Sequence, residues 1–156
     1  MSEVRAADLP AFRAWSGRLV PPGDTAGYLA WEIPVLPAMV LLELVFPRLI
    51  EVRGCVVRAD RYDKDNFDNW YDHFDGDVEQ VERITNFLRV DDWFEPGDEI
   101  EEQALQTLAD RIALGWRAQA ARQFPERPLV AEAIRSTEDY GPVVVLYTGI
   151  GRRAPA

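Results

Sequence analysis

Residues 60–102 read DRYDKDNFDNWYDHFDGDVEQVERITNFLRVDDWFEPGDEIEE, and they hold most of the charge imbalance of the chain. The stretch contains 16 carboxylates against four cations, a difference of −12, whereas the net charge of the whole chain is −10. Its aromatic residues Phe67, Trp70, Tyr71 and Phe74 are spaced by three or four positions, so they share one helix face while the acids fall on others. The pattern predicts an acidic helix over about residues 66–74 with its aromatic face turned inward.

A second helix is expected directly after this one. Asp77 is followed three residues later by Gln80, which is a capping-box arrangement, and apolar residues then recur at helical spacing up to Leu88. Asn86 and Arg89 lie off that apolar stripe. We therefore expect them to face outward or to line a groove.

The longest helix is predicted at the end of the stretch. Pro96 and Gly97 break the chain, and Asp98 with Glu101 repeats the capping-box pattern. The apolar residues that follow keep one stripe, with acids near the start and arginines later, which complements the helix dipole. The helix should run over about residues 98–124 and cross the molecule.

Segments outside the stretch supply the strands and a further helix. Residues 143–148 (VVVLYT) are unbroken in apolarity, which predicts a strand buried on both faces. We expect it to pair with the β-like run around Cys55, where Gly54 is the candidate turn of a hairpin. Residues 129–135 fit either a strand or a short helix, and the strand is favoured. Residues 37–46 are apolar nearly all round, which is typical of a helix enclosed by the fold, so we expect the central helix here.

These elements predict an α+β fold, with four or five helices (one long, about 98–124) packed on a small antiparallel sheet of about three strands. A length of 156 residues fits one domain, assigned to residues 1–151, with a disordered tail at 152–156. A single cysteine excludes an internal disulfide and fits a reducing compartment. The longest apolar run is interrupted by prolines and an acid, so we expect a cytoplasmic protein without a membrane span.

Composition also narrows the classes of partner. A pI near 4.6 disfavours nucleic acid and anionic membranes, because both would repel the surface. A basic protein is the partner that this charge accommodates best. Sixteen arginines against one lysine suggest a bacterial source with a GC-rich genome.

Candidate catalytic and metal-binding residues have simpler interpretations. His73 is the only histidine, so a two-histidine metal motif is excluded, and a surface position beside acids is favoured. Cys55 lies in an apolar run where cysteine usually acts as a small buried hydrophobe. The spacing of the aspartates does not match a calcium loop. We therefore expect no catalytic residue, no metal and no cofactor, and an enzyme is the less favoured class.

The segregated negative charge and the lack of a catalytic motif favour a non-catalytic, acidic protein-binding module, such as an immunity-type or antitoxin-type inhibitor of a basic bacterial enzyme. A plain solvated face is the simpler explanation of the same charge. Two alternative functions are a small-molecule-binding protein or enzyme with an aromatic-lined pocket, and a homodimeric scaffold joined through exposed aromatic residues. The carboxylates expected to contact a basic partner are Asp65, Asp68, Asp72, Asp75, Asp91, Asp92 and Glu95.

Overall fold

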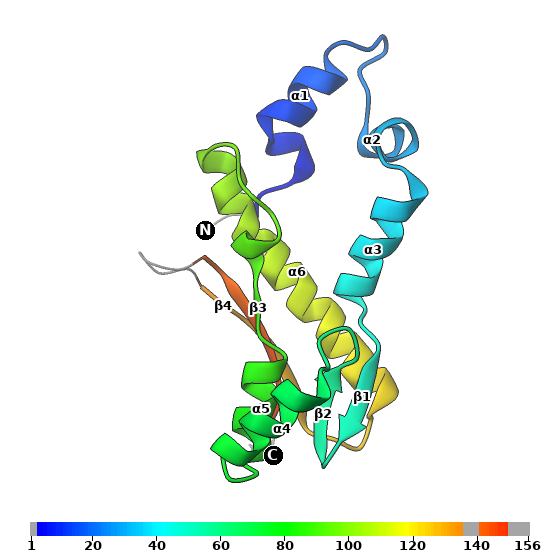
Figure 1. The fold of residues 1–156 in the computed structure, drawn as a ribbon. Helices are drawn as coiled ribbons and strands as arrows, with labels where there is room; N and C mark the ends of the chain where they lie inside the picture. The colour runs from blue at the N-terminus through cyan, green and yellow to red at the C-terminus, as the bar shows by residue number, and fades with distance from the viewer. Residues whose placement is uncertain (1–2, 136–140, 150–156) are drawn as a thin grey trace, which may run out of the picture.

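The structure, a computed structural model, describes residues 3–135 and 141–149 (Figure 1). The predicted α+β class and the long helix are confirmed, although the described residues hold six α-helices instead of four or five, and two small sheets instead of one. The helices are α1 (Pro10–Ser16), α2 (Thr25–Glu32), α3 (Val35–Val45), α4 (Lys64–His73), α5 (Val78–Thr85) and α6 (Glu99–Gln123), with short 3₁₀ turns η1 (Ala6–Asp8) and η2 (Val90–Asp92). The strands are β1 (Leu49–Val52), β2 (Cys55–Arg58), β3 (Leu88–Arg89), β4 (Leu129–Ile134) and β5 (Val143–Thr148).

The strands form two separate antiparallel sheets. β1 and β2 make the expected hairpin, which turns through Arg53 and Gly54, both with positive φ. β5 lies between β3 and β4 in the order β3-β5-β4, so the favoured strand at residues 129–135 is confirmed. The predicted pairing of residues 143–148 with the Cys55 region is wrong. Side chains of α5 stand between β2 and β5 and occupy the hydrogen-bonding groups that such a pairing would use.

The long helix α6 is the central element. Its buried face includes Leu105, Ile112, Trp116 and Ala120, and it packs on β4 and β5 in one apolar cluster. Val56 of β2 joins this cluster, whereas its neighbours on that strand point to the opposite face, because successive side chains alternate across a strand. A second cluster of Cys55, Val57, Phe67 and Val81 therefore lies under α4 and α5.

The expectation that residues 37–46 form the central, enclosed helix is wrong. The helix exists as α3, but none of its residues is buried. It contacts α6 near its C-terminal end, where the indole Nε1 of Trp116 donates to the Leu44 carbonyl at 2.8 Å and Gln119 donates to the Phe46 carbonyl. The central helix is α6, although its outer face is polar. An apolar circumference, as in α3, therefore did not identify the helix that the fold encloses.

The N-terminal helices form an arch beside α6, in which α1 leads up, α2 lies at the outer end and α3 returns (Figure 1). The rings of Phe12, Trp15 and Tyr28 pack together, and Trp15 Nε1 donates to Glu32 at 2.8 Å. The start of helix α2 is capped in the ordinary way, since the Asp24 carboxylate accepts from Gly27 N.

The expected tail at 152–156 lies outside the described residues, and the assignment of one domain to residues 1–151 stays a prediction. Within the described ranges, no single helix is long and apolar enough to cross a bilayer. The consecutive helices α2 and α3, bent by 119° relative to each other, pass that test of length and composition only as a pair.

Candidate functional site

The aspartates of α4 share one face of the helix. At 3.6 residues per turn, Asp65, Asp68 and Asp72 fall within about 60° of each other around the axis. Phe67 and Phe74 lie on the opposite side, where Phe67 is 1% exposed in the second apolar cluster. The inward aromatic face expected from the sequence is therefore present for Phe67, Tyr71 and Phe74, which belong to or pack against that cluster. Trp70 instead contacts the rings of His73 and Phe74.

The remaining acid near α4 lies just past its end. Asp75 is exposed and has φ 49, directly before Gly76, which also has a positive φ. Asp65, Asp72 and Asp75 have no ion pair within the described residues. We call these three residues the α4 acidic face.

The other predicted contact residues are arranged differently. Asp68 pairs with Lys64 at 2.7 Å and with Arg53 at 3.3 Å, and both contacts hold the pKa of its carboxyl below the usual value. Asp91 and Asp92 both pair with Arg89, at 2.9 and 3.7 Å. The chain therefore uses three of the seven predicted carboxylates in its own ion pairs.

The structure does not bring all seven residues together. Asp91 and Asp92 form part of η2, with Glu95 just after it, between β3 and the start of α6. In Figure 1, α4 lies at the lower end of the molecule, while β3 leads away from α5 towards the N-terminal end of α6. The predicted contact residues thus divide into an α4 group and an η2 group.

His73 and Cys55 do not form a catalytic pair. His73 is exposed at the end of α4, where its ring contacts the rings of Trp70 and Phe74 instead of a carboxylate, as far as the described residues show. Cys55 is fully buried in the second apolar cluster, and burial, with a smaller effect of Glu82, raises the pKa of its thiol to about 11. The thiolate is therefore scarce at neutral pH, which agrees with the predicted inert role. No group of three or more His, Cys, Asp or Glu residues within 3–135 and 141–149 is arranged to hold a metal ion.

Two buried polar residues, Glu82 in α5 and Asn86 directly after it, join the two sheets, and the sequence pattern did not reveal them. Glu82 accepts from the backbone N–H of Val56 on β2 at 2.7 Å and from the backbone N–H of Thr148 on β5. Asn86, one turn later, accepts from Arg58 N and donates to the carbonyls of Val56 and Leu146, at 2.8, 2.9 and 3.0 Å. These side chains thus satisfy backbone groups of β2 and β5 that no strand partner reaches.

The expectation that Asn86 faces outward or lines a groove is wrong, because it is fully buried. Glu82 is also fully buried, and this burial raises the pKa of its carboxyl although the hydrogen bonds from Val56 and Thr148 and the nearby charge of Arg127 oppose the shift. The signal in the sequence that could have revealed these two residues is their spacing. Residues 82 and 86 are four apart beside the apolar stripe of α5, which places a polar pair on one side of a half-buried helix.

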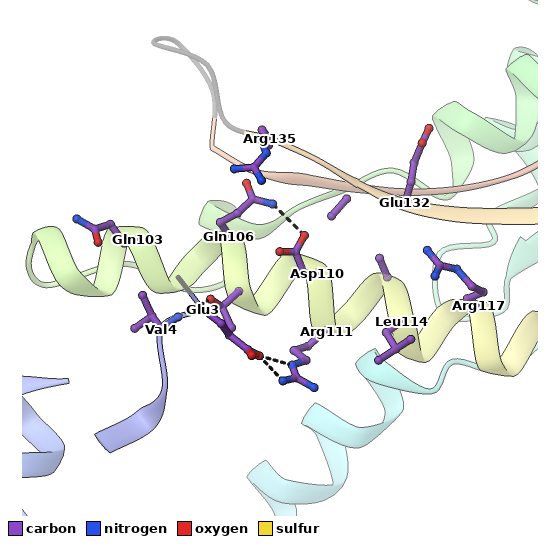
Figure 2. Close-up of a pocket in the computed structure, with 13 residues that line it drawn as sticks. Glu3, Val4, Gln103, Gln106, Asp110, Arg111, Leu114, Arg117, Glu132 and Arg135 are labelled. Carbon is purple, nitrogen blue, oxygen red and sulfur yellow. Dashed lines mark hydrogen bonds and ion pairs between the residues drawn. The ribbon is translucent and has the colours of Figure 1, made fainter. Parts of the chain in front are cut away.

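A cavity of about 630 Å³ runs along α6, between the N-terminal segment and β4 (Figure 2). Figure 2 shows the ion pair of Glu3 with Arg111 and the hydrogen bond from Gln106 to Asp110 among the lining residues. Its six charged residues are three arginines and three acids, and none of the lining residues is aromatic (Glu3, Val4, Gln103, Gln106, Thr107, Asp110, Arg111, Ala113, Leu114, Arg117, Glu132, Ala133 and Arg135). This lining does not match the aromatic-lined pocket expected for a small-molecule function.

A large apolar surface covers α2 and α3, and we call residues 25–46 the apolar arm. A second cavity, of about 420 Å³, lies between α3 and the side chains of Trp93 and Phe94. The arm contains two charged residues, Glu32 and Glu43, and no lysine or arginine. Its large exposed apolar residues are Leu29, Trp31, Ile33, Val35, Leu36, Met39, Val40, Leu41, Leu42 and Phe46.

Comparisons of this chain with protein-family models, with curated proteins and with solved structures found no match.

Proposed function

We propose that this protein is a non-catalytic binding module of a bacterial cytoplasm that recognises a basic protein, in the manner of an immunity-type inhibitor that covers a cationic site. The observation that carries the proposal is the α4 acidic face. Its three carboxylates are exposed and have no ion pair in the described residues, on a helix whose other side is anchored in the apolar interior. Exposed charges on a rigid element speed the encounter with a surface of opposite charge.

The local pairing of charges focuses the proposal on α4. Asp91 and Asp92 are drawn to Arg89, so a basic partner would have to compete with a cation of the same chain. Asp65, Asp72 and Asp75 face no such competition. We therefore place the first contact with a basic partner on α4, with the η2 group outside it.

Salt dependence and charge removal test this proposal together. A tagged chain is used to isolate basic proteins from its source cells, and each identified protein is purified. The purified protein is then titrated against the chain at about 50–300 mM salt, a range over which the Debye length shortens and exposed charges are screened more strongly. The triple variant Asp65→Asn, Asp72→Asn, Asp75→Asn should weaken binding about 3-fold to 100-fold, because each exposed ion pair contributes about 0.2–1 kcal/mol. Asn is suitable at position 75, since it tolerates positive φ better than most residues.

The matched control removes the same charge elsewhere. Glu99→Gln and Glu102→Gln at the start of α6 and Glu126→Gln after its end neutralise three exposed carboxylates outside the predicted contact residues, and binding should stay close to that of the original chain apart from a small general loss. Equal weakening by both triple variants would mean that net charge alone, and not the α4 acidic face, governs binding. Affinity that does not change with salt would contradict the electrostatic basis of the proposal.

A further inference from the structure

We propose that the apolar arm is the interface of a homodimer, in which the arm of a second copy of this chain covers it. The motivating observation is the exposure of α3 around most of its circumference. Leu36 is 72% exposed and Val40 is 56% exposed, although both belong to a helix that is apolar on nearly every side. Contact with α6 covers only the end of the helix around Leu44 and Val45.

The area involved is that of a stable dimer. The ten large apolar residues of the arm are 36–84% exposed. Their summed exposed area is on the order of 1,000 Å², if each is given an area near the range of about 150–250 Å² that holds for aromatic side chains. The largest apolar patch on a typical monomer is about 300–600 Å². A standard interface buries about 800 Å² on each partner. The exposed apolar area of the arm thus exceeds the largest patch of a typical monomer, and it is large enough for one side of a standard interface.

The surface offers both a large exposed side chain and an apolar cavity, which two copies of the chain can pair with each other. Trp31 is 84% exposed at the end of α2 and projects as a large apolar side chain. The cavity of about 420 Å³ beside α3 is lined by apolar residues, including Trp93 and Phe94. A twofold axis would place the Trp31 side chain of each copy against the cavity of the other, so that one contact is made twice, as closed dimers require.

Charge favours a second copy over a basic partner. Of the two acids in the arm, Glu32 already accepts from Trp15, and no cation is present. A basic surface would therefore gain little from the arm and would bury unpaired charge against it. Two copies of a chain with net charge −10 repel each other over most of their surface, and the arm is the region where this repulsion is weakest.

Sedimentation equilibrium of the full chain at concentrations from about 1 to 100 μM measures the association directly. The expected result is a dimer whose dissociation constant does not rise with salt. Val40→Asp places a charge in the apolar cavity that receives Trp31 of the other copy, and it should raise the dissociation constant at least 100-fold. Trp31→Ala should raise it at least 10-fold.

The matched control is Ile84→Asp on α5, where an apolar side chain that is 38% exposed lies outside the arm. It should leave the dimer unchanged. A chain that remains monomeric over the whole concentration range would overturn the proposal without any variant, as would a dimer that survives Val40→Asp.

A lipid surface is the other occupant that the bent α2–α3 pair would fit by composition. A monomer in buffer that binds neutral phosphatidylcholine vesicles through the arm would overturn the dimer in favour of that occupant.

Discussion

Glu82 of α5 and Asn86, which directly follows α5, allow a sharp prediction, because the Glu82 carboxylate only accepts hydrogen bonds whereas the Asn86 amide group also donates two. Both carboxylate oxygens of Glu82 accept a backbone N–H, from Val56 and from Thr148. Glu82→Gln keeps the shape but replaces one acceptor with an NH₂ group, so one N–H loses its partner. A buried donor without a partner costs about 1–3 kcal/mol. The free energy of unfolding should fall by that amount, which lowers the melting temperature by roughly 2–12 °C for a chain of this size.

Asn86→Asp is the complementary change and should cost more. The Asn86 amide donates to the carbonyls of Val56 and Leu146, and an aspartate would place an oxygen against both. A buried charge without compensation costs about 3–5 kcal/mol. The control is Glu79→Gln on the same helix, which removes a partly exposed ion pair with Arg83 and should cost about 0–1 kcal/mol.

Urea unfolding followed by tryptophan fluorescence gives the three free energies, and unchanged slopes confirm that the unfolding reaction is the same. Hydrogen exchange locates the effect, since Glu82→Gln should speed exchange at the amides of Val56 and Thr148 before others. If both variants cost no more than Glu79→Gln, the side chains do not hold the two sheets together. The account of why β2 and β5 remain unpaired would then be refuted.

Two further predictions concern the attachment of α3 and the response to pH. A Cβ at Gly115 would lie 2.2 Å from the Val45 carbonyl oxygen. Gly115→Ala should therefore lower the free energy of unfolding by about 1–3 kcal/mol through overpacking, despite the better helix propensity of alanine. Thermal melts followed by circular dichroism would measure the change. Burial raises the folded-state pKa of Glu82 above its ordinary value of 4.5, so its contribution to stability is fully present below that value and is lost as pH rises through the folded-state pKa. The difference in unfolding free energy between the original chain and Glu82→Gln should therefore shrink as pH rises, and a difference that is constant or grows with pH would contradict the burial effect.

The features predicted correctly from sequence depend on local signals. Asp77 and Asp98 cap α5 and α6, as the capping patterns indicated, and each accepts from the backbone N–H three residues later. The aromatic spacing around Phe67 placed α4, and the apolar stripe of α6 gave its bounds to within one residue. Each of these signals is contained within one or two helical turns, so the rest of the chain does not alter it.

The features predicted wrongly depend on which distant groups meet. Unbroken apolarity in residues 143–148 identified β5 but not its neighbours, because a strand buried on both faces carries no register pattern that selects a partner. Glu82 and Asn86 resemble ordinary polar helix residues until the edges of β2 and β5 are brought to them. The helix α3 shows the same limit, since its composition is that of an enclosed helix and does not say whether its own chain or another molecule encloses it.

The two proposed surfaces can be separated by their response to salt, because they depend on different forces. Binding through the α4 acidic face should weaken as salt rises, since screening reduces attraction between exposed charges. Association through the apolar arm should persist or strengthen, because screening reduces the repulsion between two copies of an acidic chain while apolar burial remains. In Figure 1 the apolar arm and α4 occupy different parts of the molecule, so a dimer formed through the arm would leave both copies of α4 exposed. Such a dimer would present two acidic faces to a basic partner, and its avidity for a partner with two cationic sites would exceed that of the Val40→Asp monomer although each α4 is unchanged.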